Sequence, residues 1–166
     1  MTLEREGAMK VIYHCYGGSH ASPVAAAIHL QQLPTTCIPT TEELRQLKFF
    51  DTVPPSFHGT LVHLGRDENG HDIFILGARN QSQTLLKTLR EVTRIIGENE
   101  QNYLFADVKP CINLIMRLGG FLSRKIGLIF PGRPLVTCGV KKAYPQIVAL
   151  VEDTRNRLVR IQAGGS

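Results

Sequence analysis

The residues with the clearest chemical potential lie together near the start of the sequence, in the segment 14–23, which reads HCYGGSHASP. Lys10–Cys15 is short, apolar and β-branched, which predicts a buried strand. Ala21–Leu33 predicts a helix, with Pro23 in its first turn, where a missing N–H costs little. The glycine-rich turn between them would leave the free backbone N–H groups of the helix start, and the positive end of its dipole, at the carboxyl edge of a sheet. Such an arrangement is typical of sites that bind anions.

We therefore predict that this turn binds an anionic or phosphate-containing small molecule. Backbone N–H groups, hydroxyls and an imidazole would supply the hydrogen-bond donors. The residues expected to contact the ligand are Gly17, Gly18, Ser19, His20 and Ser22.

Two side chains of the same turn could perform catalysis. Cys15 is the candidate nucleophile, with His20 as an accessory acid or base. Arg79 and Asp107 fall at predicted strand ends and could line the same cleft, although Asp107 could equally cap the helix that begins near Cys111. Three functions stay open: ligand binding without turnover, a Cys15-dependent enzyme, and a non-catalytic regulatory or interaction protein in which the turn is purely structural.

Strands and helices alternate along the rest of the chain. Gly59–Gly65 and His71–Gly77 flank Asn69-Gly70, a dipeptide that favours a tight hairpin turn, so we expect these two runs to pair antiparallel. Helical patterns cover 21–33, 41–47, 82–96, 111–125 and 140–157.

Two further apolar runs, Tyr103–Val108 and Leu135–Cys138, are expected to lie beside Lys10–Cys15 as parallel strands. The predicted fold is a three-layer α/β/α domain with a mixed, mostly parallel sheet and one β-hairpin. We assign 1–8 to an N-terminal tail, 9–160 to a single domain and 161–166 to a C-terminal tail.

Composition limits the partners. The net charge of +5 comes without a dense Lys/Arg run, so nucleic acid is not expected. No apolar run approaches the ~20 residues of a membrane-spanning helix, and we expect no membrane partner. The four cysteines are scattered and the first residues lack an apolar signal core, so we expect reduced thiols in a cytoplasmic protein with no metal and no cofactor. The oligomeric state is left open.

The first turn resembles a known phosphate-binding loop. Cys15 is followed by five residues and then by Ala21-Ser22-Pro23, whereas low-molecular-weight protein tyrosine phosphatases and related arsenate reductases have Cys, five residues, Arg and Ser or Thr after their first strand. In that family the thiolate attacks phosphorus while the Arg and the loop N–H groups hold the phosphate. Ala21 stands where the Arg belongs, and the late Asp-Pro pair that supplies the general acid is absent. The resemblance implies a related cradle, for which Arg79 or Arg133 could provide the missing guanidinium.

A second resemblance covers almost the whole chain. The segments MKVIYHCYGGSHAS, GRDENGHDIFILG, MRLGGFLSRK and GRPLVTCGVKKAYPQIVALV are similar to the bacterial family catalogued as domain of unknown function 3189. This similarity runs from residue 9 to about residue 155. It implies a bacterial protein and no established activity.

Overall fold

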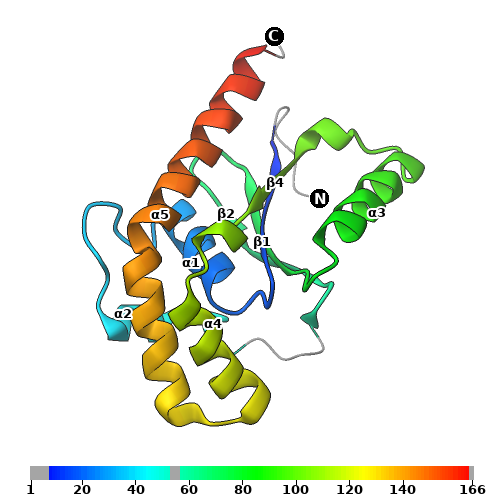
Figure 1. The fold of residues 1–166 in the computed structure, drawn as a ribbon. Helices are drawn as coiled ribbons and strands as arrows, with labels where there is room; N and C mark the ends of the chain where they lie inside the picture. The colour runs from blue at the N-terminus through cyan, green and yellow to red at the C-terminus, as the bar shows by residue number, and fades with distance from the viewer. Residues whose placement is uncertain (1–7, 53–56, 165–166) are drawn as a thin grey trace.

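A computed structural model describes residues 8–52 and 57–164 and contains one four-stranded sheet (Figure 1). β1 lies inside the sheet and runs parallel to both of its neighbours, β3 and β4, whereas β2 pairs antiparallel with β3. The mixed sheet and the hairpin are therefore as predicted. In spatial order the strands are β2 (Leu61–Arg66), β3 (Asp72–Gly77), β1 (Lys10–Cys15) and β4 (Tyr103–Asp107).

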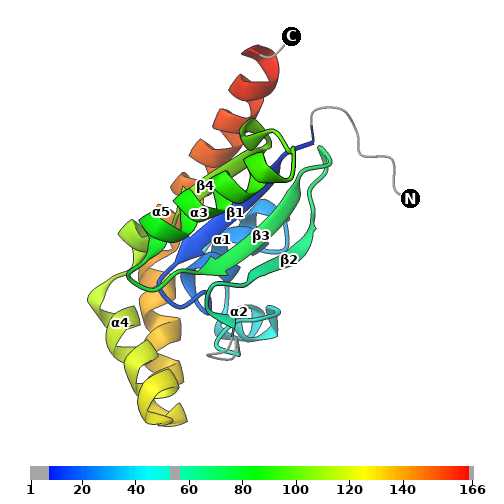
Figure 2. The ribbon, with the colours of Figure 1, turned by 90° about the vertical axis from the view of Figure 1, so that its right-hand side faces the viewer.

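Helices cover both faces of the sheet, which gives the predicted three layers (Figure 2). α3 (Ser82–Ile95) lies on one face, while α1 (Ala21–His29) and α5 (Ile129–Gly164) pack together on the other. The remaining helical segments are α2 (Thr41–Gln46), η2 (Glu100–Asn102), η3 (Lys109–Cys111), α4 (Leu114–Gly120) and the π-helical η4 (Phe121–Ile126).

The main hydrophobic core lies between the sheet and the α1/α5 layer. Because successive strand residues point to opposite faces, Val11, Tyr13 and Cys15 of β1 enter this core. Ile12 and His14 point to the α3 side, where both are buried. The first strand is thus buried on both faces, as its continuous apolar run predicts.

The expected strand Leu135–Cys138 is wrong, because this run lies inside α5. Pro134 sits in the first turn after the non-helical backbone of Phe130, where a proline does not interrupt the helix. Val136 and Val140 are both buried, at the i, i+4 spacing of a helix face. α5 also continues to Gly164, so residues 161–164, which we assigned to a tail, are helical.

α4 and α5 form a helical hairpin whose close contact depends on a glycine in α4. A Cβ on Gly119 would come within 2.5 Å of the backbone nitrogen of Val136. The predicted helix 111–125 is divided into three segments, with η3 at its start, α4 in its middle and η4 at its end. Within the described ranges, no helix is both long and apolar enough to cross a membrane.

Candidate functional site

The glycine-rich turn folds around the side chain of Cys15, the last residue of β1. The Gly18 N–H donates to Cys15 Sγ at 3.1 Å, and Ser22 Oγ, in the first turn of α1, lies 3.1 Å from the same sulfur. Cys15, Ser19 and Ser22 are all buried. The structure thus brings the predicted thiol, hydroxyls and helix start together at the carboxyl edge of the sheet.

The two glycines of the turn have different roles. Gly18 has a φ of +70°, and a Cβ there would lie 2.9 Å from the backbone nitrogen of Gly77 at the end of β3. Packing of the turn against the end of β3 therefore requires a glycine at position 18 whether or not a ligand binds. Around Gly17, by contrast, a Cβ would meet no atom within 4 Å, so this position opens away from the protein.

Asp51, which we did not predict, connects this turn to the helical hairpin. Its backbone N–H donates to Ser19 O at 2.8 Å, and its Oδ1 accepts from His20 Nε2 at 2.9 Å. Its carboxylate also accepts from Ser123 Oγ at 3.2 Å and from Arg133 Nε at 2.7 Å. Burial alone would raise the pKa of Asp51, but the hydrogen bonds from His20 and Arg133 outweigh burial and hold that pKa below its usual value.

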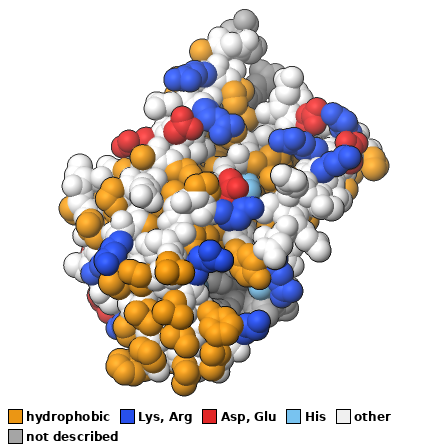
Figure 3. All heavy atoms as spheres, viewed as in Figure 1, with side chains coloured by type: hydrophobic (Ala, Val, Ile, Leu, Met, Phe, Trp, Pro, Cys, Tyr) orange, Lys and Arg blue, Asp and Glu red, His pale blue; other side chains and the backbone are white. Residues whose placement is uncertain are grey.

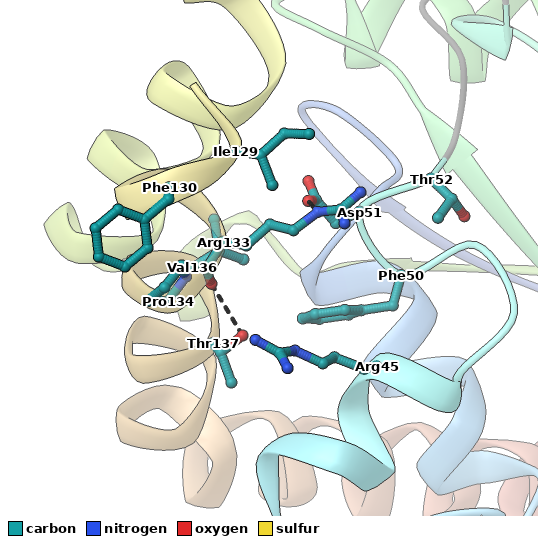
Figure 4. A pocket seen from close by; sticks show the side chains of 10 residues that line it. All are labelled: Arg45, Phe50, Asp51, Thr52, Ile129, Phe130, Arg133, Pro134, Val136 and Thr137. Carbon is teal, nitrogen blue, oxygen red and sulfur yellow. Dashed lines mark hydrogen bonds and ion pairs between the residues drawn. The ribbon is translucent and has the colours of Figure 1, made fainter. Parts of the chain in front are cut away.

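A cavity of about 370 Å³ lies beside Asp51, between α2 and the start of α5 (Figure 4). Arg133 extends from α5 toward Asp51, and Arg45 extends from α2 toward Thr137. Most of the remaining wall is apolar. The cavity is lined by Arg45, Phe50, Asp51, Thr52, Ile129, Phe130, Arg133, Pro134, Val136 and Thr137.

Arg79 and Asp107 lie at the same sheet edge as the turn but hold other partners. The Arg79 N–H donates to Tyr16 O at 2.9 Å, while its guanidinium lies 3.4 Å from His58 Nδ1. Asp107 Oδ1 accepts the Lys109 N–H at 3.0 Å, at the first residue of the short helix η3. His20 is paired with Asp51 rather than with Asp107.

Asp107 also approaches His14 on the α3 side of the sheet, with 3.6 Å between Oδ1 and Nδ1. This distance is longer than a hydrogen bond, and His14 Nδ1 is buried without a hydrogen-bond partner. Burial lowers the pKa of His14. Among the described residues, no cluster of three or more His, Cys, Asp or Glu side chains is arranged to hold a metal ion.

A second histidine–aspartate pair, His29–Asp67, lies at the opposite end of α1. His29 Nε2 lies 3.2 Å from Asp67 Oδ2, and Tyr13 Oη donates to His29 Nδ1 at 2.7 Å. Asp67 Oδ1 also accepts the backbone N–H groups of Asn69 and His71 in the hairpin turn. His29 is thus a buried histidine with satisfied hydrogen bonds.

Asp51 was missed because its partners lie far away in sequence. Ser123 and Arg133 are 72 and 82 residues from it. One local signal was present: an aspartate directly after Phe49-Phe50 and shortly before Pro54 marks a polar residue entering an apolar segment. Burial of such a carboxylate requires partners, which predicts a cluster without saying which residues form it.

Of the comparisons with known proteins, the one against protein families agrees with the resemblance that covers almost the whole chain. No curated protein and no solved structure matches the chain. Residues 10–156 match the family described as protein of unknown function DUF3189. Since the match spans nearly all of the folded elements, from β1 into α5, the chain belongs to the DUF3189 family.

Proposed function

We propose that the protein binds a small phosphate-containing or otherwise anionic molecule at the turn Gly17–Ser22. The observation that carries this proposal is the position of Cys15 Sγ, 3.1 Å from both the Gly18 N–H and Ser22 Oγ, at the first turn of α1. Donors that converge on a soft, electron-rich atom at a helix start also favour an anion placed beside that atom. The open space at Gly17 gives a ligand room to approach the backbone.

The surrounding structure supports a preorganised site. Asp51 holds Ser19 through its backbone and His20 through its side chain, so the middle of the turn is fixed before a ligand arrives. Preorganised donors cost little ordering entropy when the ligand binds.

The test uses inorganic phosphate and a matched pair of variants at Gly17. Gly17→Asp places a carboxylate at the turn, and Gly17→Asn adds the same shape without the charge. We expect phosphate to raise the Tm of the parent and of Gly17→Asn, with at least a tenfold weaker response in Gly17→Asp. A ligand at one hundred times its Kd stabilises a protein by about 2.7 kcal/mol, which thermal unfolding detects easily. Equal responses from the two variants would contradict the proposal.

A second candidate function is phosphoryl or arsenate-type chemistry with Cys15 as the nucleophile. It is favoured by the position of Sγ at the first turn of α1, beside the Gly18 N–H and Ser22 Oγ. In a phosphoryl transfer the thiolate would form an S–P bond as the P–O bond to the leaving group breaks, and His20 would protonate the leaving oxygen. Water would then cleave the S–P bond and restore the thiolate.

Hydrolysis of p-nitrophenyl phosphate separates turnover from binding. We expect the parent and Cys37→Ser to hydrolyse it and Cys15→Ser to be inactive while still responding to phosphate in thermal unfolding. Cys37 is a suitable control because its side chain is exposed. An inactive parent, or an active Cys15→Ser variant, would remove this candidate and leave the binding proposal to its own test.

A further inference from the structure

The cavity beside Asp51 has the size and lining of a small-molecule site distinct from the Cys15 turn. Its volume of about 370 Å³ lies in the range of pockets that hold small ligands. A second hollow of about 460 Å³ continues along α5 and shares Arg45, Pro134 and Thr137 with the first. Arg45 thus stands between the two hollows, with its side chain directed across the first (Figure 4).

The electrostatics of this region favour an anion. Among the described residues, Asp51 is the one carboxylate that lines the first cavity, and it already accepts hydrogen bonds from His20, Ser123 and Arg133. Arg45 forms no ion pair with any residue in the described ranges. Lys141 and Lys142 line the second hollow beside Arg45.

The rest of the lining favours an apolar ligand body. Phe50 and Val136 form buried walls, and Ile129 and Phe130 stand at the rim, with exposed fractions of 58% and 80%. Figure 3 shows apolar side chains gathered over α4 and the start of α5, with Lys and Arg nearby. An apolar wall combined with an unpaired guanidinium is complementary to a molecule that has an apolar body and an anionic group.

We propose that this cavity binds a small amphiphilic anion: a carboxylate, sulfonate or phosphate ester with an aromatic or branched apolar body. The apolar body lies against Phe50, Ile129 and Val136. The anionic group pairs with the guanidinium of Arg45. The inference does not depend on anion binding at Gly17–Ser22, because none of those residues lines the cavity.

The test compares two fluorescent probes of similar apolar shape. 8-Anilinonaphthalene-1-sulfonate carries an anionic group, and N-phenyl-1-naphthylamine lacks it. We expect the folded parent to bind the sulfonate at least tenfold more tightly than the neutral probe. Arg45→Gln should weaken sulfonate binding five- to tenfold and leave the neutral probe unchanged, whereas Ile129→Ser should weaken both.

Two control variants locate the binding. Lys48→Gln removes a nearby cation that does not line the cavity, and Leu114→Ser alters an apolar side chain on α4 that is 76% exposed. Neither should change sulfonate binding more than twofold. The proposal is overturned if Lys48→Gln weakens the sulfonate as much as Arg45→Gln does, because the effect would then be general surface charge. It is equally overturned if Leu114→Ser abolishes binding, which would place the probe on the exposed face of α4.

Discussion

The two ends of α1 carry the same chemical pair in different surroundings. At the carboxyl edge of the sheet, His20 pairs with Asp51, and its side chain is 14% exposed. At the opposite end, His29 pairs with Asp67, and its side chain is fully buried. His20–Asp51 borders a cavity and the Cys15 turn, whereas His29–Asp67 is enclosed by Tyr13 and by backbone groups of the hairpin turn.

This difference separates a structural pair from a site pair. His29 Nε2 and Asp67 Oδ2 join α1 to the β2–β3 turn, while His29 Nδ1 bonds Tyr13 of β1 and Asp67 Oδ1 accepts two backbone N–H groups of the turn. Each of these four atoms thus has a partner within the protein. Asp51 instead joins a turn to helices that line a hollow. A histidine–aspartate pair alone therefore does not identify a site; its position relative to the sheet edge and the cavity does.

The largest expected effect is on the structural pair. Asp67→Ala leaves the buried His29 and two backbone N–H groups without their acceptor. Loss of such a buried acceptor costs about 3–5 kcal/mol. Urea denaturation of the variant should show a free energy of unfolding lower by that amount, and a loss below about 1 kcal/mol would mean that the pair is not structural.

Asp51→Ala should cost less, about 1–3 kcal/mol, because the half-exposed Arg133 can turn to water when its partner is lost. The same variant should weaken the phosphate response at the Cys15 turn, since His20 loses the carboxylate that positions it, while the backbone hydrogen bond to Ser19 stays. Urea denaturation and phosphate titration on one sample check both parts. If Asp51→Ala is destabilised as much as Asp67→Ala but binds phosphate normally, Asp51 is a structural residue rather than part of the site.

Acid should also distinguish the two pairs. Burial lowers the pKa of His29 below the unfolded value of 6.5, so on acidification the unfolded chain takes up a proton before the folded protein does. Stability contributed by neutral His29 is complete above pH 6.5 and falls as the pH drops toward the folded pKa, by about 1.4 kcal/mol for each unit that separates the two values.

The matched variant is His29→Gln, whose free energy of unfolding should change less between pH 7.5 and 5.5 than that of the parent. His14, also buried with a lowered pKa, keeps its own contribution in both proteins. The stability that Asp51 contributes changes in a different pH range. The pKa of Asp51 is lowered from 3.8, so its contribution is present above pH 3.8 and is lost only in stronger acid. Equal pH dependence in parent and variant would contradict the assignment to His29.

The smallest effect is expected for His20→Gln. A glutamine amide can still donate to Asp51, and the site is partly open, so the free energy of unfolding should fall by less than about 1 kcal/mol. Thermal and urea unfolding check this value. A larger loss would place His20 with the structural pair.

Local signals predicted the parts of the fold that depend on neighbouring residues. The hairpin followed from Asn69-Gly70, and β1 and β4 followed from short apolar runs. The run Leu135–Cys138 looked the same, but its true period continues through Val140 along α5, and only the longer window reveals a helix.

The contacts of the candidate site divide in the same way into local and distant ones. The contact between Cys15 and Ser22 joins residues seven apart on a strand and the following helix, so the motif itself brings them together. The cluster around Asp51 could not be predicted in this way, because Arg133 reaches it only after α5 has crossed the sheet face. Asp51 also has a positive φ of 54°, a backbone conformation that the residue type alone does not predict.

The central position of β1 has a consequence for synthesis on the ribosome. β1 emerges before the other strands of the sheet, and its partners β3 and β4 follow it at register separations of 62 and 93 residues. The β2–β3 hairpin closes locally, and α1 packs against β1 soon after the strand emerges, but the two edges of β1 must wait for both neighbouring strands. A nascent chain therefore carries an apolar strand with unpaired edges until β4 has emerged, and we expect its yield to depend on chaperones that shield such segments.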